Sequence, residues 1–362
     1  GYAVRGADLA SDPAPSLHVV DTVAAGSFPS RGLERGEAIR IMTGAPVPGG
    51  ADSIIRHEDT DNGREAVTIL NKRDIGKNIR RAGEDFRRGD TLFERGELLT
   101  PAHIGALASA GIQSVDVHRG PRVALISSGD ELVELRDFRP ELAGAKIVSS
   151  NSMTLASLVR DAGGEADDLG IARDAPSSLA EKLSAARGAD LMITSAGISV
   201  GDHDHVRTAF TDLGGQIHFW KVRMKPGAPL AFGTLNGTPW IGVSGNPVSA
   251  MVSFEVFVRP VIRKMLGHRL LFRQTIPVTL GEAVTLAAPL MHFLRVVITD
   301  DGNGRYTAAL AGSQSSSVLT AMARANALLI LPGDRLVLAA GETHRALPLG
   351  DSLRLSETLV LA

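Results

Sequence analysis

The spacing of hydrophobic and polar residues changes along the chain, and it first predicts a region of strands and loops. In residues 1–83, short apolar runs such as residues 53–55 are broken by turn sequences at residues 46–50 and 61–63. Residues 84–120 contain one helical pattern, which begins with Pro101. We therefore expect a β-rich region followed by a connecting region.

Residues 121–268 show a different pattern, in which continuous apolar runs alternate with helical spacing. The apolar runs, which are typical of strands buried on both faces, are residues 123–126, 191–193, 230–232 and 240–243. Helices are predicted over residues 151–163, from a capping box at Ser178 and Glu181, around residues 206–213, and over residues 246–267 with a kink at Pro260. This alternation predicts an α/β domain with a parallel sheet covered on both faces.

From residue 269 onward the pattern returns to β structure. Residues 293–299 and 305–310 flank the sequence Asp-Asp-Gly-Asn-Gly at 300–304, which is a strong hairpin signal. The apolar run at residues 327–331 is far shorter than the roughly 20 residues that cross a bilayer. No signal segment is visible either, so we expect no contact with a membrane.

The composition excludes several classes of site. The chain has 38 Lys and Arg residues and 40 Asp and Glu residues, which gives a net charge of −2. This charge argues against binding of nucleic acid through the overall electrostatic field of the protein. The chain has no cysteine, which excludes disulfides, iron–sulfur clusters, thiolate zinc sites and thiol nucleophiles. It also lacks the glycine motif of dinucleotide-binding folds and the P-loop motif.

Three loops that follow predicted strands combine small residues, hydroxyls and glycines. They are residues 127–131, 195–204 and 244–247. Loops of this kind let backbone N–H groups approach a phosphate closely. The third loop also opens the longest predicted helix, whose first turn favours an anion. Because ligands of parallel sheets bind beyond the carboxyl ends of the strands, these loops are the expected site.

Charged residues accompany these loops. The acidic ones are Asp130, Glu131, Asp174, Asp202 and Asp204, and the basic ones are Lys221 and Lys225. Carboxylates beside a phosphate indicate Mg²⁺ between them, and the lysines would bind an anion. The alternatives are ordinary: Asp174 and Asp204 each precede a predicted helix and are equally well explained as N-caps. The two lysines, and the histidines on either side of Asp204, are also compatible with solvated surface residues.

A set of motifs then gives a resemblance to a known family. Residues 40–48 (RIMTGAPVP), 50–52 (GAD) and 58–60 (EDT) begin it, and residues 80–85 (RRAGED), 128–132 (SGDEL), 195–201, 221–227 (KVRMKPG), 245–250 (GNPVSA), 312–313 and 325–332 (ANALLILP) continue it in order. The chain resembles the molybdopterin molybdenumtransferases, which insert molybdate during molybdenum cofactor synthesis. The C-terminal part of gephyrin is similar.

The resemblance implies an α/β plus β multidomain fold. Its parts would be a β-rich domain in residues 1–83, an elongated linker domain in 84–120, a molybdopterin-binding-type α/β domain in 121–268 and a C-terminal β-barrel in 269–362. It also implies a cytoplasmic, elongated homodimer, in which the β-rich domain of one subunit completes a cleft on the α/β domain of the other. Contacts with an adenylyltransferase or with cofactor-receiving enzymes are further implied.

The implied reaction joins molybdate to adenylylated molybdopterin, cleaves the pyrophosphate bond and releases AMP with the help of Mg²⁺. The catalytic positions that match the family motifs are Thr43, Asp85, Glu131, Asp174, Lys221 and Lys225. The implied metal ligands are Glu131, Asp174, Asp202 and Asp204. The implied positions for the substrate are Ser128, Gly129, Ser195, Gly197, Ser199, Gly201, Gly245, Asn246, Pro247, Arg295 and Ser313. Of these, Thr43 and Asp85 would come from the partner subunit.

Two positions depart from the family pattern, and two other functions stay open. Ala196 stands where many relatives carry Gly, and Ser244 stands where many carry Pro, so both could alter a loop.

One alternative function is a molybdopterin adenylyltransferase, which would not need residues 1–116 and 269–362. The other is a gephyrin-like scaffold without catalysis, which would leave the acidic and lysine positions free to drift. Molybdate and tungstate both fit this sequence.

Overall fold

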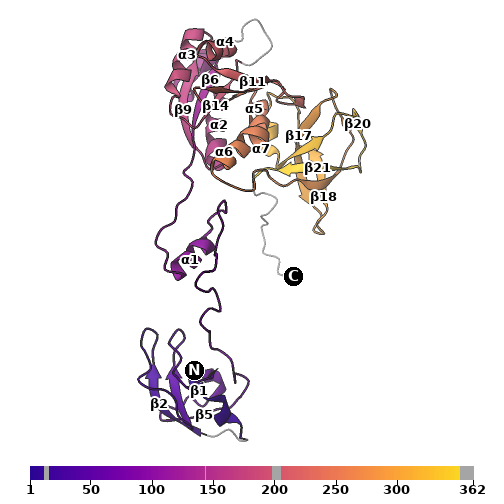
Figure 1. Ribbon diagram of the computed structural model, residues 1–362. Coiled ribbons are helices and arrows are strands. Elements are labelled where there is room, and N and C mark those ends of the chain that lie inside the picture. The colour runs from indigo at the N-terminus through magenta and orange to yellow at the C-terminus, as the bar shows by residue number, and fades with distance from the viewer. Residues whose placement is uncertain (12–15, 143, 198–204, 351–362) are drawn as a thin grey trace. The chain divides into compact units, whose positions relative to one another are not determined.

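The computed structural model describes residues 1–11, 16–142, 144–197 and 205–350. The chain divides into two compact units, Gly1–Phe93 and Glu94–Ala362, and each is considered by itself (Figure 1). In the described ranges, every helix is too short or too polar to cross a membrane.

The first unit is built on a five-stranded sheet with the order β4-β1-β3-β2-β5. Its elements are β1 (Tyr2–Val4), η1 (Gly6–Leu9), β2 (Ser16–Val23), β3 (Glu37–Ile41), β4 (Ser53–Ile55), η2 (His57–Asp59) and β5 (Ala66–Thr68). Strands β2 and β3 run parallel, and the pairing ends at Val23 and Ile41. Apolar side chains are buried on both faces of the sheet. The β-rich character expected for this region is confirmed.

The second unit begins with a segment that carries α1 (Pro101–Ser109). Pro at the first turn and a capping box between Thr100 and His103 explain why the helix starts there. Arg269 pairs with Glu94 at 2.8 Å and with Glu97 at 3.4 Å, and these contacts hold the segment to the chain that follows the α/β domain.

The α/β part contains a six-stranded sheet with the order β11-β13-β14-β10-β6-β9. Its strands are β6 (Arg122–Ser128), β9 (Glu165–Ala172), β10 (Leu191–Ser195), β11 (Gln216–Trp220), β13 (Leu230–Leu235) and β14 (Thr238–Val243). Strands β14, β10, β6 and β9 run parallel to one another. Strands β13 and β11 are antiparallel additions at one edge. The predicted parallel sheet is therefore confirmed for four strands and wrong for β13 and β11, because a tight hairpin joins β13 to β14 without a crossover helix.

Helices cover both faces of this sheet (Figure 1). They are α2 (Ser150–Asp161), α3 (Pro176–Ala185), α4 (His205–Asp212), α5 (Pro247–Ser253), the π-helical turn η5 (Phe254–Val258) and α6 (Arg259–Met265). One core joins the sheet to α2, α5 and α6, and a second core joins its other face to α3 and α4. The connection between β6 and α2 contains the short elements β7 (Leu132–Val133), η3 (Leu135–Asp137), η4 (Pro140–Leu142) and β8 (Ile147–Val148).

Two helix predictions need correction. The capping box at Ser178 is wrong, because α3 already begins at Pro176 and the Ser178 hydroxyl accepts a hydrogen bond from the N–H of Arg173 at 3.1 Å. The long helix before Gly267 contains a π-helical turn directly before Arg259 and Pro260. Because Pro260 has no N–H to donate to the preceding turn, a wider turn accommodates it there.

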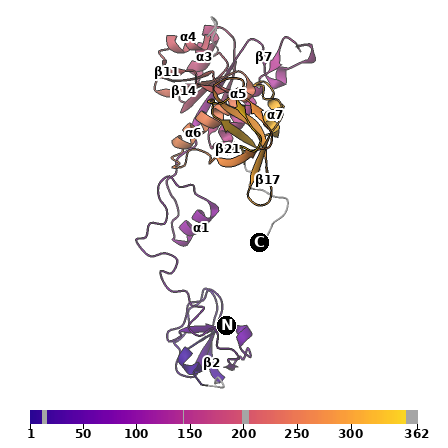
Figure 2. The same cartoon turned by 90° about the vertical axis from the view of Figure 1, so that its right-hand side faces the viewer.

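The C-terminal part is a barrel that closes through β17-β18-β15-β21-β19 and back to β17. Its elements are β15 (Ile276–Leu280), β16 (Val284–Thr285), β17 (Met291–Asp300), β18 (Tyr306–Leu310), α7 (Leu319–Arg324), β19 (Ala327–Leu331), β20 (Val337–Leu338) and β21 (Thr343–Pro348). The hairpin predicted at residues 300–304 joins β17 to β18. A short strand from the α/β segment, β12 (Met224–Lys225), adds to β17 in parallel. A shared apolar core also packs the barrel directly against α5 and α7 (Figure 2).

Candidate active site

The connections of the sheet diverge between β6 and β10. The chain leaves β6 for α2 on one face, and after β10 it continues into α4 on the other face. A neighbouring pair of parallel strands whose connections diverge in this way is where α/β sheets bind ligands. Ser128 ends β6 and Ser195 ends β10, so both predicted substrate-binding serines lie at this point.

Three buried hydroxyls join β6 to the start of α2. Ser127 Oγ lies 2.9 Å from Ser152 Oγ and accepts a hydrogen bond from Ser149 Oγ at 3.2 Å. Ser149 and Ser152 also bond to each other at 2.7 Å. Each hydroxyl is thereby satisfied by another, so the cluster leaves none of the three buried hydroxyls without a hydrogen bond.

Asn151 is a central residue that the sequence analysis missed. Its Nδ2 donates to Ser195 Oγ at 2.6 Å and to the carbonyl oxygen of Gly245 at 2.8 Å. These two hydrogen bonds link the end of β10 to the loop after β14. Its Oδ1 is buried and has no hydrogen-bond partner among the described residues. A buried amide oxygen without a donor is costly, so this atom can accept a hydrogen bond from a ligand. The only signal in the sequence was an amide in the first turn of a helix with an apolar face.

Two aspartates connect the loops after β6 and β9. Asp174 Oδ1 accepts a hydrogen bond from Ser128 Oγ at 3.1 Å, and its Oδ2 accepts one from the N–H of Asp130 at 3.3 Å. The N–H of Asp174 in turn donates to Asp130 Oδ1 at 3.3 Å. Helix α3 has Ala175 at its N-cap position with no side-chain cap. The N-cap explanation for Asp174 is therefore wrong, and its carboxylate belongs to the carboxyl edge of the sheet.

Gly129 and Glu131 complete this edge. The φ angle of Gly129 is +152°, which favours glycine. The two carboxylate oxygens of Glu131 lie 2.6 and 2.7 Å from the position that a Cβ of Gly129 would occupy. The Glu131 side chain therefore folds back over the loop, and a larger residue at position 129 would displace it.

The loop after β10 has an unusual backbone. Ala196 adopts a φ of +74° and Gly197 a φ of +69°. Only the glycine takes this conformation without strain. The Cβ of Ala196 lies 3.0 Å from where a Cβ of Gly245 would stand, so the two loops touch. The predicted residues Ser199, Gly201, Asp202 and Asp204 lie outside the described residues.

The loop after β14 connects the sheet edge to the barrel. Asn246 is the N-cap residue of α5, and Pro247 occupies the first turn. The N–H of Asn246 donates to Ser244 Oγ at 3.2 Å. The backbone N–H of Asn246 was expected to bind a phosphate, but in this chain it already donates to the Ser244 hydroxyl. The N–H of Val248 donates to the carbonyl oxygen of Ser316 at 3.1 Å, which ties α5 to the loop that contains Ser313.

The two predicted lysines lie on the strand segment that leads into the barrel. In the parallel pairing of β12 with β17, the backbone of Lys225 lies opposite that of His292, and the Lys225 side chain is exposed. Lys221 is also exposed and has a φ of +86°. A Cβ on Gly227 would lie 2.7 Å from Ser253 Oγ of α5, so the turn after Lys225 packs closely on that helix. Neither ammonium group has a hydrogen-bond or ion-pair partner in the part of the chain that the structure describes, so both can bind an anion.

Arg295 is the most unusual charge in the barrel. Its side chain is fully buried, and burial lowers the pKa of its guanidinium. Nη2 donates to the carbonyl oxygens of Ser313 at 3.2 Å and Ser315 at 3.1 Å. Nε and Nη1 have no partner among the described residues. A buried cation with free donors is costly unless an anion binds to it, so this part of β17 is suited to an oxyanion.

Thr43 and Asp85 belong to the first unit. Thr43 lies in the turn after β3, where the N–H of Ala45 donates to the carbonyl oxygen of Met42 at 3.0 Å. Both predicted side chains are exposed. They are therefore available to contact another molecule.

The described carboxylates bear on the predicted metal site. Within the described ranges no three His, Asp or Glu side chains gather as a metal cluster would. Glu131 has no hydrogen-bond or ion-pair partner on its carboxylate there, and Asp174 has two oxygens at the same edge. One or two carboxylates completed by phosphate oxygens and water are a sufficient donor set for Mg²⁺. The residues therefore fit a magnesium ion that arrives with a phosphate ligand.

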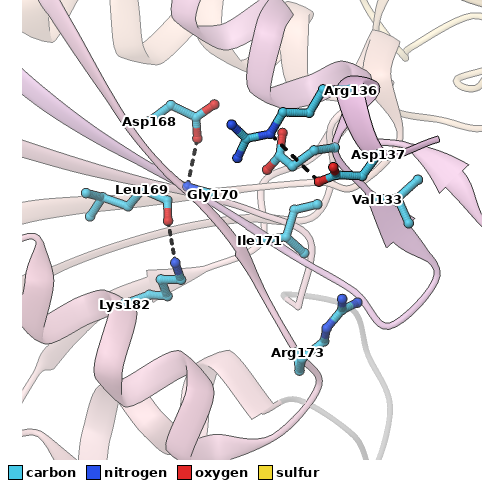
Figure 3. Close-up of a pocket in the computed structure, with 10 residues that line it drawn as sticks. Val133, Arg136, Asp137, Asp168, Leu169, Gly170, Ile171, Arg173 and Lys182 are labelled. Atoms are coloured by element: carbon cyan, nitrogen blue, oxygen red, sulfur yellow. Dashed lines mark hydrogen bonds and ion pairs between the residues drawn. The ribbon is translucent and has the colours of Figure 1, made fainter.

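A pocket of about 520 Å³ lies beside the site, against the edge strand β9. It is formed by β7, η3, β9 and α3 (Figure 3). Lys182 of α3 donates to the carbonyl oxygen of Leu169 at 2.6 Å. Arg136 and Asp137 lie across the pocket from it in the same view. This pocket was not predictable from the sequence, because it depends on how the connection between β6 and α2 folds over β9.

Comparison with known proteins agrees with this architecture. Three family profiles match the chain: the MoeA N-terminal region (domain I and II) at residues 1–111, a probable molybdopterin binding domain at 124–264, and the MoeA C-terminal region (domain IV) at 277–349.

Individual relatives and a solved structure agree as well. The molybdopterin molybdenumtransferase of Nostoc sp. is 36% identical over 94% of this chain and 80% of its own length. Molybdopterin molybdenumtransferase 2 of Mycobacterium tuberculosis is 38% identical over 94% of this chain and 85% of its own length. The molybdopterin biosynthesis moeA protein of Pyrococcus horikoshii superposes with a TM-score of 0.79 at 26% identity, over 96% of this chain and 86% of that one. The chain therefore belongs to the molybdopterin molybdenumtransferases, a family of transferases in molybdenum cofactor biosynthesis.

Proposed function

We propose that this protein inserts molybdate into adenylylated molybdopterin and releases AMP. The observation that carries the proposal is the polar carboxyl edge of the sheet. There Asp174 bonds to Ser128 at the end of β6, and Asn151, whose Oδ1 has no partner among the described residues, bonds to Ser195 at the end of β10. In the reaction the two dithiolene sulfurs bind molybdenum, and one molybdate oxygen leaves as water with the two thiol protons. A water molecule cleaves the pyrophosphate bond and gives AMP and the molybdopterin monophosphate.

The phosphate groups would lie at the acidic edge of the sheet. Mg²⁺ held by Glu131 and Asp174, with Asp202 and Asp204 as further candidates, would neutralise the phosphate charge and polarise the bond that breaks. Asp174 is preset for this role by its bonds to Ser128 and Asp130. Gly129, Gly197, Gly201 and Gly245, with Ser195, Ser199, Asn246 and Pro247, would shape the loops around the substrate.

Molybdate would bind where the barrel meets the α/β domain. Arg295 offers two buried nitrogens, Nε and Nη1, whose N–H groups have no partner among the described residues, and it lies on β17 next to the loop of Ser313. Lys225 is on the strand that pairs with the same β17. Lys221 and Lys225 would add positive charge at the entrance, where they attract an oxyanion.

A second subunit would complete the site. Thr43 and Asp85 are exposed and would reach the substrate from the partner in a homodimer. Several large apolar side chains are exposed near α1, among them Leu98 at 64%, Ile104 at 53% and Val117 at 68%. These exposed apolar side chains support the proposed interface, because a partner that covers them removes apolar surface from water. We further propose four domains with limits at residues 83, 120 and 268, and a location in the cytoplasm.

The test is AMP release from adenylylated molybdopterin in the presence of Mg²⁺, with and without molybdate. An insertase releases AMP only when molybdate is added. A molybdopterin adenylyltransferase would instead consume ATP and molybdopterin, and a scaffold would do neither. The first alternative is disfavoured by the matched N- and C-terminal regions at residues 1–111 and 277–349.

A further inference from the structure

The pocket against β9 contains a carboxylate and an ammonium group that face the same space without pairing. A Cβ on Gly170 would lie 3.6 Å from Glu134 Oε1 and 3.7 Å from Lys182 Nζ. Gly170 has a φ of +80° and lies where the pairing of β9 with β6 is irregular. Glycine is therefore favoured at this position, and its missing side chain leaves the space between the two charges open.

Most charged groups that line the pocket already have partners. These partnerships are Asp168 with the N–H of Gly170 at 2.9 Å, Arg136 with Asp137 at 3.8 Å, Arg173 with the carbonyl oxygen of Leu132 at 3.3 Å, and Lys182 with that of Leu169 at 2.6 Å. The half-buried carboxylate of Glu134 is different, because no hydrogen bond or ion pair reaches it from the described residues. Lys182 also keeps two of its three N–H donors.

These two groups match one kind of heterocycle edge. A 2-amino-4-oxopyrimidine ring offers a ring N–H and an amino N–H side by side, which a carboxylate accepts with its two oxygens. The carbonyl oxygen next to them accepts from an ammonium. Ile171 and Val133 line the same pocket and supply apolar contact for the ring. The volume of about 520 Å³ lies in the range of small-ligand sites.

We infer that Glu134 and Lys182 bind the 2-amino-4-oxopyrimidine edge of the pterin in this pocket. The inference rests on the proposed function, which supplies a pterin substrate. The pocket is close in sequence to both acidic loops, since its lining residue Arg173 precedes Asp174 and its lining residue Val133 lies two positions after Glu131. A pterin held there keeps its phosphate-bearing side chain near the acidic edge. Guanine presents the same ring edge, so the test separates the two sources.

The experiment measures binding of unsubstituted pterin to the full chain by fluorescence titration, without Mg²⁺, molybdate or any nucleotide. The variant Glu134→Gln keeps the side-chain shape but replaces one acceptor oxygen with a donor. We expect it to weaken pterin binding by about tenfold or more. The matched control is Glu141→Gln. Glu141 is an exposed glutamate in η4, in the same connection between β6 and α2, and this variant should bind pterin as the parent does.

Two further arms test the chemistry of the ligand. A 2,4-dioxopteridine lacks the amino donor and should bind the parent about tenfold more weakly than pterin, with little further loss in Glu134→Gln. Guanosine should bind more weakly than pterin, and tighter binding of guanosine would overturn the pterin assignment. Equal pterin affinity in the parent and Glu134→Gln, with both variants folded, would also overturn it. Because no AMP is measured, this result is independent of whether the proposed reaction occurs.

Discussion

Asp130 and Asp174 hold each other in a reciprocal pair: the N–H of each donates to the carboxylate of the other, both at 3.3 Å. The pair joins the loops that follow β6 and β9, and Ser128 adds a third hydrogen bond to Asp174 at 3.1 Å. Carboxylates fixed in this way lose little freedom when a cation or a phosphate-bound metal arrives. The acidic edge is thus formed before the ligand binds.

The first prediction concerns Asp174. Asp174→Asn keeps one oxygen that can accept from Ser128 but removes the negative charge, so the fold should survive while Mg²⁺ binding is lost. We expect AMP release to fall on the order of 100-fold. Raising the Mg²⁺ concentration should restore part of the rate if the metal is the missing element. A normal rate in this variant would remove Asp174 from the site.

The second prediction concerns Lys225. Its exposed side chain has no hydrogen bond within the described residues, so Lys225→Ala should leave the melting temperature nearly unchanged while cofactor formation falls at least about tenfold. Lys264→Ala, an exposed lysine in the last turn of α6, is the matched control and should retain full activity. Equal losses of stability and activity in Lys225→Ala would make the residue structural.

The third prediction concerns the buried guanidinium. Because Arg295 has two donors without partners, Arg295→Met should be as stable as the parent without ligand, or more stable by about 1 kcal/mol. Saturating molybdate should raise the melting temperature of the parent, since a ligand at about 100 times its Kd adds about 2.7 kcal/mol. The same addition should leave Arg295→Met unchanged. A full molybdate shift in this variant would place the oxyanion elsewhere.

The fourth prediction concerns the backbone of the loop after β10. Ala196 has a φ of +74°, which costs an L residue about 1–2 kcal/mol. Ala196→Gly should therefore raise the melting temperature, although part of the gain is lost to the greater freedom of glycine in the unfolded chain. Ala180→Gly in the interior of α3 should lower stability by about 1 kcal/mol. Two changes of the same sign would contradict the strain at Ala196.

Much of the fold could be predicted from local pattern. The hairpin at residues 300–304 and the buried strands near Val123 and Leu191 were predicted correctly, because turn chemistry and continuous apolar runs are local signals. The antiparallel placement of β13 was not predicted, since an apolar run does not reveal its direction. The addition of β12 to the barrel depends on a contact with residues 67 positions later in the chain.

The site was predictable only in part. Loops with glycine and hydroxyls after strands indicated the edge that holds Ser128 and Asp174. Asn151, Glu134 and Lys182 had no distinguishing pattern, because their importance comes from what lies beside them: an amide oxygen without a donor, and two charges around a glycine. Arg295 and Ser313 were found only through the family resemblance, since nothing near them in sequence indicates a buried cation.

The central claim is tested most directly by measuring molybdenum incorporation and AMP together in one reaction with adenylylated molybdopterin and Mg²⁺. The account predicts that AMP and molybdenum-loaded cofactor appear in equal amounts, and that neither forms when molybdate is omitted. Release of AMP at the same rate without molybdate, or molybdenum incorporation without AMP, would contradict it.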